Sequence, residues 1–265
     1  YADVLKDAQA LGYAESDPAA DVEGSDAADK IAILSGLAFG GAINRAEIPT
    51  TGINLLQAID VNYARKLGYG IKLLAISEKD KTQSPLPKSQ PLSIWVEPTL
   101  VPEDSPLAGV SGVNNAILVE GNPIGQVMFF GPGAGSGPTA SAVVADILNI
   151  AGILSTNEDT ISNLDPLLSA KSWRSCHVSK KEQITKKNYI RLIAEDSPGV
   201  IGEIGTIFGQ KKISIESIVQ FDATDKEAEI VVITHKIRQG QLEEALIDIK
   251  NLSQVKRIAA KMGCL

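Results

Sequence analysis

The sequence predicts an α+β fold: helices packed on a mixed or antiparallel sheet, followed by a smaller module with the ferredoxin-like order βαββαβ. Apolar residues recur with the helical period in some segments and alternate with the strand period in others. Short turns containing Gly, Pro and Asn join neighbouring strands, which favours antiparallel pairing. A polar stretch at residues 155–187 separates the two patterns.

Helices and strands are mixed in the first part of the chain. Residues 4–11 have a helix-like pattern, and Gly68-Tyr69-Gly70 marks a change from helix to strand. Glu120-Gly121-Asn122-Pro123 stands between two apolar runs, which predicts a hairpin. The other predicted helices cover residues 26–39, 53–67 and 139–154, and the predicted strands cover residues 71–76, 92–96, 116–120 and 124–130.

The second part of the chain has the pattern of one small module. Its strands are predicted at residues 189–194, 213–220, 229–235 and 255–259, and its helices at residues 200–208 and 242–252. This order is the ferredoxin-like βαββαβ. We therefore expect a first domain over residues 1–154, a linker over residues 155–187 and a second domain over residues 188–265.

The composition is that of a globular protein and excludes several classes of function. Hydrophobic residues make up 44% and charged residues 22% of the 265 residues, which suits two compact domains. The net charge of −7 disfavours nucleic-acid binding, because a nucleic-acid partner needs a clustered basic face. Two distant cysteines, Cys176 and Cys264, form neither a disulfide framework nor a zinc pattern, and we assign no metal.

The sequence also leads to an expectation about location. No apolar stretch is expected to reach the ~18–20 residues of a membrane span, and no charged-then-apolar leader opens the chain. The cysteine usage favours a reducing compartment, so we expect a cytoplasmic protein with no membrane partner. Because the chain begins at Tyr1, inside a helix-like pattern, we expect a piece of a longer protein.

Lys30 is the most informative residue for chemistry, because it interrupts the apolar run of residues 27–34. Such a run predicts a helix buried in the core, where an ammonium group needs carboxylates or hydrogen bonds to offset its desolvation. Burial lowers the pKa of a lysine and nearby carboxylates raise it, and this combination suits an acid or base near neutral pH. Among the carboxylates that precede Lys30 are Glu15, Asp17, Asp21 and Asp26.

Asp26 and Lys30 stand four residues apart, and this spacing has a simpler interpretation. On a helix it forms an ordinary surface ion pair, with the acid first as the favourable order. Spacing alone favours this surface pair, whereas the apolar neighbours favour a buried lysine. Glu15 and Asp21 fall in a segment with Pro18 and Gly24 that predicts a loop, and such loops commonly hold ligands.

A glycine-rich segment, GPGAGSGP at residues 131–138, lies between a predicted strand and a predicted helix. It does not fit the dinucleotide pattern G-x-G-x-x-G, because Ser136 replaces the third glycine of one frame and Pro138 interrupts the other. No P-loop lysine follows it. Two readings remain open: the bare backbone approaches a ligand beside the free N–H groups of the helix, or the segment is a connector.

In the second module, residues 195–200 join the first strand to the first helix. Asp196 or Ser197 is expected to cap that helix, with Pro198 in its first turn. Capping would explain this segment completely, so a ligand role needs other support. His177 and His235 are interpreted as packed or exposed residues and not as ligands.

Two long motifs resemble the signature of the homoserine dehydrogenase family. The first is LGYAESDPAADVEGSDAADK at residues 11–30, and the second is GPGAG at residues 131–135, followed by PTAS at residues 138–141. The second module resembles the ACT domain that many members carry. Because the family begins with a nucleotide-binding Rossmann domain, we expect this chain to be the catalytic and regulatory remainder of such an enzyme.

The resemblance implies reduction of L-aspartate 4-semialdehyde to L-homoserine with NADP or NAD as the cofactor, on the route to threonine, methionine and isoleucine. It implies that Lys30 gives a proton to the carbonyl oxygen and that Asp26 orients Lys30. The implied substrate-binding residues are Tyr13, Glu15, Asp21 and Asp26. The implied cofactor-binding residues are Gly131, Gly133, Ala134 and Gly135.

The ACT resemblance implies an amino-acid effector, expected to be threonine, and feedback inhibition. The family also implies a homodimer through the substrate domain, or a homotetramer if the ACT modules pair. The alternative is that the chain by itself is a non-catalytic amino-acid-binding and oligomerisation fragment. The implied effector-binding residues are Asp196, Gly199, Val200 and Ile201.

Overall fold

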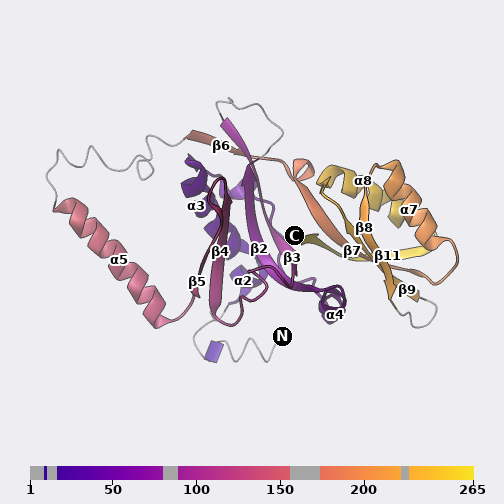
Figure 1. Cartoon of the computed structure of the whole chain (residues 1–265), viewed down its shortest axis with the longest axis horizontal. Helices are drawn as coiled ribbons and strands as arrows, with labels where there is room; N and C mark the ends of the chain where they lie inside the picture. The colour runs from indigo at the N-terminus through magenta and orange to yellow at the C-terminus, as the bar shows by residue number, and fades with distance from the viewer. Residues whose placement is uncertain (1–8, 11–16, 80–88, 156–173, 222–226) are drawn as a thin grey trace. The chain divides into compact units, whose positions relative to one another are not determined.

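The computed structural model describes residues 9–10, 17–79, 89–155, 174–221 and 227–265. The chain divides into two compact units, whose elements are drawn in Figure 1. The hairpin unit comprises Tyr1–Ala20 and Glu103–Arg174, and the sheet unit comprises Asp21–Pro102 and Ser175–Leu265. The sheet unit thus combines part of the predicted first domain with all of the predicted second domain.

Nine strands among the described residues form one sheet. They are β1 (Gly41–Ala42), β2 (Tyr69–Lys79), β3 (Ser89–Pro102), β6 (Arg174–Val178), β7 (Thr185–Glu195), β8 (Ile215–Phe221), β9 (Glu227–Thr234), β10 (Ile237–Arg238) and β11 (Val255–Cys264). Their order is β1-β6-β3-β11-β7-β9-β8, with β2 also beside β3 and β10 beside β7. Because β3 pairs in parallel with β6 and β11 but antiparallel with β2, the sheet is mixed, as predicted.

Strand β3 joins the two predicted domains. Antiparallel β2 covers one edge of β3 along its length, while the other edge pairs first with β6 and then, at Thr99 and Leu100, with β11. The predicted strand ends at residue 96, before Pro98 and Pro102. That end was wrong, since the strand continues to Pro102 and its last residues reach β11.

The second module has the predicted βαββαβ order. Helices α7 (Val200–Gln210) and α8 (Gln239–Lys250) follow β7 and β9, as Figure 1 shows. One hydrophobic core includes residues from both helices and from alternate positions of the strands, among them Ile190, Ile230 and Val232. The strand period of two therefore places one face of this part of the sheet against α7 and α8.

Four further helices of the sheet unit lie before β2. They are α2 (Ala19–Glu23, whose first two residues fall in the hairpin unit), α3 (Ser25–Phe39), the short 3-10 helix η1 (Arg45–Glu47) and α4 (Ala58–Lys66). The prediction for α3 is confirmed to within one residue. Helix α4 begins five residues later than predicted, because Gln57 and Asp60 form a capping box that starts it at Ala58.

The hairpin unit contains the predicted hairpin and the predicted long helix. β4 (Asn114–Gly121) pairs antiparallel with β5 (Gly125–Pro132), and α5 covers Ser136–Leu154. With 19 residues, α5 is long and apolar enough to cross a membrane by length and composition alone. The expectation that no stretch reaches that length was therefore wrong, although such a helix is weak evidence for a membrane span.

The predicted linker, residues 155–187, is not uniformly without secondary structure. It contains β6, the 3-10 helix η3 (Lys181–Gln183) and the start of β7, while residues 156–173 lie outside the described residues. Residues 89–92 of β3 pair with β6 in parallel, so this part of the segment belongs to the sheet. Its polar composition hid a strand that is stabilised by pairing and not by hydrophobic periodicity.

Candidate functional site

Asp26 and Lys30 form an ion pair on the first turns of α3. The Lys30 Nζ and Asp26 Oδ2 atoms are 2.6 Å apart, and the exposed fractions of the two side chains are 61% and 42%. The pair is the ordinary one expected from acid-first spacing on a helix. The prediction of a buried lysine was wrong, because Lys30 is exposed within its unit.

The exposure of Lys30 follows from how α3 packs. The helix buries Ala28, Ser35 and Gly36 against the sheet, which is only part of the apolar run. Ile33 and Leu37 share the helix face of Lys30 and are also exposed. The apolar run therefore contributes to two faces of α3. One face packs on β3, and the other carries the charged pair among exposed apolar side chains.

The segment before α4 connects α2 to β3. The backbone N–H of Ile53 donates to the Val22 carbonyl oxygen at 2.8 Å, and the N–H of Thr51 donates to the Val96 carbonyl oxygen at 2.8 Å. A Cβ atom on Gly52 would lie only 2.2 Å from the Val22 oxygen, so only glycine permits this approach. The segment before α4 therefore fixes α2, and through it the turn from which Asp26 and Lys30 project.

A second ion pair holds α3 from its other side. Arg45 of η1 donates from Nε to Asp29 Oδ1 at 2.7 Å and from Nη2 to the Ser25 carbonyl oxygen at 3.4 Å. Asp29 adjoins Lys30 in sequence but pairs with a different cation. Sequence reasoning did not assign a role to Asp29 or Arg45, since their sixteen-residue separation has no helical spacing to reveal it.

The other predicted substrate ligands are placed only in part. Asp21 lies exposed on α2, so the predicted loop around it was wrong; this helix starts where the Ala19 N–H donates to Asp17 Oδ1. Tyr13 and Glu15 lie outside the described residues. Within the described ranges, no group of three or more His, Cys, Asp or Glu side chains is arranged to hold a metal ion.

The glycine-rich segment belongs to the hairpin unit. Gly131 lies in β5, and Gly135 precedes α5 with no side chain capping the helix. The side-chain nitrogen of Asn115 lies only 1.3 Å from where a Cβ atom on Gly133 would be, so a larger residue at position 133 requires the Asn115 side chain to move. Gly131 has open space at the same position, and the uncapped N–H groups of α5 remain available to a ligand.

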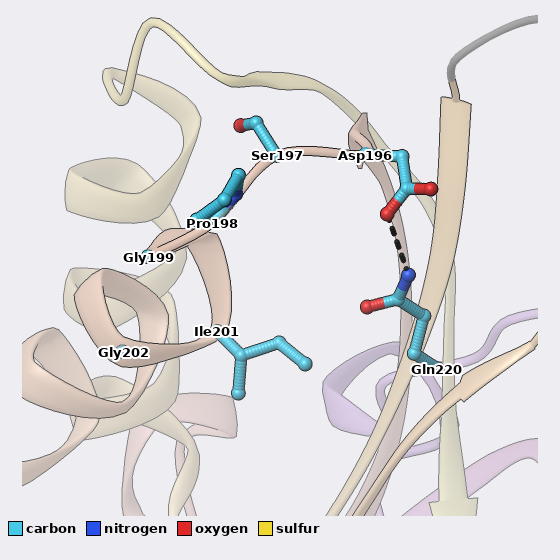
Figure 2. Close-up of a pocket in the computed structure, with 7 residues that line it drawn as sticks. All are labelled: Asp196, Ser197, Pro198, Gly199, Ile201, Gly202 and Gln220. Carbon is cyan, nitrogen blue, oxygen red and sulfur yellow. Dashed lines mark hydrogen bonds between the residues drawn. The ribbon is translucent and has the colours of Figure 1, made fainter.

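A pocket of about 370 Å³ opens beside the first turn of α7. Figure 2 shows Asp196 and Gln220 together on the strand side of the pocket, opposite the start of α7, where Gln220 Nε2 donates to Asp196 Oδ1 at 2.9 Å. Ile201 points into the same space. The pocket is lined by Asp196, Ser197, Pro198, Gly199, Ile201, Gly202 and Gln220.

The predicted capping role of Asp196 or Ser197 was wrong. The residue before α7 is Gly199, with a φ of 98°, and no side chain caps the helix. Helix capping therefore does not explain this segment. The Asp196 carboxylate and the first N–H groups of α7 are available to a ligand. Val200 is 3% exposed in the core, so only its backbone can take part.

Gln220 is the pocket residue that sequence reasoning missed. It stands 24 residues from Asp196, near the end of β8. The two side chains meet because β7 and β8 lie on either side of β9 and run in the same direction. A signal for this proximity exists only in the predicted βαββαβ order. That order brings the ends of its first two strands to one edge of the module.

The chain is similar to known proteins along nearly its whole length. Residues 1–148 match the family of homoserine dehydrogenases, and residues 188–254 match the ACT domain family. The chain is 49% identical over 99% of its length to a homoserine dehydrogenase of Synechocystis sp., and 40% identical over 97% to one of Neisseria gonorrhoeae. It covers 60% and 57% of those two proteins.

A solved structure gives the same result. The crystal structure of a homoserine dehydrogenase from Thiobacillus denitrificans matches with a TM-score of 0.87 at 35% identity, over 100% of this chain and 58% of that one. The chain therefore spans about three fifths of the length of the relatives that it matches.

Proposed function

The chain belongs to the homoserine dehydrogenase family, and on this premise we propose that it is the substrate-binding and regulatory part of an enzyme that reduces L-aspartate 4-semialdehyde to L-homoserine. The observation that carries the proposal is the Asp26–Lys30 pair, exposed beside the apolar side chains of Ile33 and Leu37. A charged pair in such surroundings can meet a small polar substrate and exclude water once a further surface covers it.

In the proposed reaction Lys30 donates a proton to the carbonyl oxygen of the semialdehyde while hydride reaches the carbonyl carbon. The nicotinamide cofactor, NADPH or NADH, supplies that hydride. Asp26 orients the Lys30 ammonium through their 2.6 Å contact. Asp21, Glu15 and Tyr13 remain predicted ligands of the substrate's polar groups. Net consumption is one hydride and one proton for each homoserine formed.

The residues of the glycine-rich segment suit a cofactor contact only in part. The open space at Gly131 and the uncapped start of α5 support close approach of a ligand to the backbone of Gly131, Ala134 and Gly135. Gly133 supports a cofactor contact less directly, because the Asn115 side chain occupies the space beside it. We further propose that a separate nucleotide-binding domain makes most of the cofactor contacts.

Replacement of Lys30 by alanine in the full-length enzyme tests the proton-donor role. We expect kcat to fall ~10²- to 10⁴-fold with little change in the KM for the semialdehyde, because proton donation acts in the transition state. Lys256→Ala is the matched control, since Lys256 also forms an exposed pair, with Glu227 at 2.6 Å. Turnover of Lys30→Ala near that of the control would refute the proposal.

The pocket beside α7 is proposed to bind an amino-acid effector, with threonine as the expected ligand and feedback inhibition as the result. Asp196 offers a carboxylate to the α-ammonium group, and the uncapped N–H groups of α7 suit the α-carboxylate. Ile201 lines the pocket and can contact the methyl group of threonine. The sequence match to the ACT family supports this assignment.

Calorimetric titration of threonine into the full-length enzyme tests the effector proposal. We expect saturable binding that is lost in Asp196→Asn and weakened for serine, which lacks the methyl group. Asp248→Asn is the control, because this exposed carboxylate of α8 pairs with Lys211 away from the pocket. Equal heats for wild type and Asp196→Asn would contradict the assignment.

The alternative function remains a non-catalytic amino-acid-binding and oligomerising fragment, and the partial coverage of relatives favours testing it. The isolated chain is expected to bind threonine but not to turn over the semialdehyde. We also propose a cytoplasmic homodimer or homotetramer, for which light scattering at several concentrations is the direct measurement. Reductase activity of the isolated chain would exclude the alternative.

A further inference from the structure

The ferredoxin-like part of the sheet is covered on both faces. On one face lie α7 and α8, and on the other lies α4, which comes from the predicted first domain. Tyr189 and Val231 face α4, whereas their sequence neighbours Ile190 and Val232 face the other helices. Helix α4 is therefore in direct contact with the strands that carry the effector pocket.

A buried hydrogen-bonded cluster forms the first contact between α4 and these strands. Arg191 of β7 is 1% exposed and donates from Nε to Asp60 Oδ1 at 2.7 Å. Its Nη2 atom donates to Gln57 Oε1 at 2.7 Å, and its Nη1 atom to Glu229 Oε2 at 3.1 Å. Burial alone lowers the pKa of Arg191, but hydrogen bonds and charges from Asp60 and Glu229 raise it overall, so the guanidinium stays charged.

An aromatic stack forms the second contact. The rings of Tyr63 on α4 and Phe221 on β8 are parallel to within 9°, with centroids 4.0 Å apart. The Lys66 ammonium lies 5.2 Å from the centroid of the Phe221 ring. Two separate strands are thus attached to one helix through different chemistry.

Both contacts involve strands that adjoin the pocket. Asp196 follows β7, the strand of Arg191, and Gln220 immediately precedes Phe221 on β8. The hydrogen bond between Gln220 and Asp196 joins the ends of these two strands at one side of the pocket. An α-ammonium group that binds Asp196 shares the carboxylate with Gln220, so ligand binding bears directly on the hydrogen bond that holds the Gln220 side chain of β8.

The N-terminal end of α4 leads to the Lys30 pair. The Gln57 N–H donates to Asp60 Oδ2 at 3.1 Å, so the residue that holds Arg191 also caps α4. The preceding segment contacts α2 through the hydrogen bond from Ile53 to Val22 and the close approach of Gly52. Helix α2 leads through Gly24 into α3.

We propose that α4 couples the amino-acid pocket to the Asp26–Lys30 pair, with Arg191 and the Tyr63–Phe221 stack as its two attachments to the ACT module. The proposal rests on the proposed effector function. The switch is the Gln220–Asp196 hydrogen bond, which is made without ligand and replaced when an ammonium group binds Asp196. Tyr63, Phe221 and Arg191 are positioning residues, since none of them lines the pocket.

The first test separates binding from coupling in the full-length enzyme. Threonine affinity is measured calorimetrically with and without homoserine, because coupling between two ligands must be reciprocal. In wild type we expect homoserine to weaken threonine binding by a factor within the ~5- to 150-fold range of allosteric systems. In Phe221→Leu we expect that factor to fall toward one while threonine affinity in the absence of homoserine is kept.

Phe208→Leu is the matched control, because Phe208 is a buried phenylalanine at the far end of α7 and packs on the opposite face of the sheet. It should lower stability but keep the coupling factor. A coupling factor in Phe221→Leu equal to that of wild type would overturn the proposal. Failure of the wild type to bind threonine would instead refute the effector assignment.

A second test needs no ligand. Gln220→Leu removes the switch hydrogen bond, and we expect faster amide hydrogen exchange in α4 and in the first turn of α3. Gln241→Leu is the control, since Gln241 donates to the Lys211 carbonyl oxygen away from the pocket. Unchanged protection of α4 in Gln220→Leu overturns the proposal whatever the effector is.

Discussion

Two ion pairs of the sheet unit differ in almost everything except their chemistry. The Asp26–Lys30 pair lies within one helix and is largely exposed, whereas the Asp60–Arg191 pair joins a helix to a strand 131 residues away and is at most 1% exposed. The exposed pair is available to a substrate, and the buried pair is available only to its neighbours. Burial therefore separates a pair suited to chemistry from one suited to holding elements together.

Arg191→Met should have the largest effect on stability. It leaves the Asp60 carboxylate buried without its cation, which typically costs ~3–5 kcal/mol of unfolding free energy. Urea denaturation measures this loss. The double variant Arg191→Met/Asp60→Leu should recover much of it, because well-packed apolar residues can replace a buried pair. A double variant less stable than the single one would show that the remaining polar partners, such as Gln57, dominate.

The pH dependence of stability should report another buried group, Cys264. Burial raises the pKa of its thiol to about 11. Since the pKa is higher in the folded than in the unfolded state, stability is fully present below the unfolded pKa and decreases as pH rises through about 11, by ~2–3 kcal/mol. Urea denaturation between pH 8 and pH 11 should show a steeper loss for wild type than for Cys264→Ala. Parallel curves would contradict the predicted shift.

Asp26→Asn should have the smallest effect on stability. An exposed helix pair contributes ~0.5 kcal/mol or less, because solvent screens it. Turnover should nevertheless fall, since Asp26 orients the proposed proton donor. Asp29→Asn is the control on the same helix, because it breaks the exposed contact with Arg45 at similar cost in stability. Equal turnover in the two variants would remove Asp26 from the proposed site.

Local patterns predicted most elements because their causes are local. The hairpin of β4 and β5 follows from a turn sequence between two apolar runs, and α3 follows from helical spacing of apolar residues. The elements that were predicted wrongly depend on residues far away in the sequence. Strand β6 is stabilised by pairing with β3, and the end of β3 by pairing with β11, and neither partner is visible in the segment itself.

The candidate sites show the same limit. The motif of residues 11–30 identified Lys30 and Asp26, but not that their helix leaves them exposed. The segment before α7 identified Asp196, yet its actual partner Gln220 comes from a distant strand. Arg191 and Asp60 escaped notice because each has ordinary neighbours in sequence, and only the packing of α4 on β7 brings them together.

Helical and strand periods, turn residues and two family motifs were sufficient to determine the α+β class, the βαββαβ order and the residues around Lys30, because each depends on short stretches of chain. Tertiary packing decided three other features. These are the buried face of α3, the polar partner of Asp196, and the helix that covers the second face of the sheet in the ferredoxin-like module. Burial is a property of what lies opposite a side chain, and for Lys30, Arg191 and Gln220 that neighbour was decided by the assembled sheet.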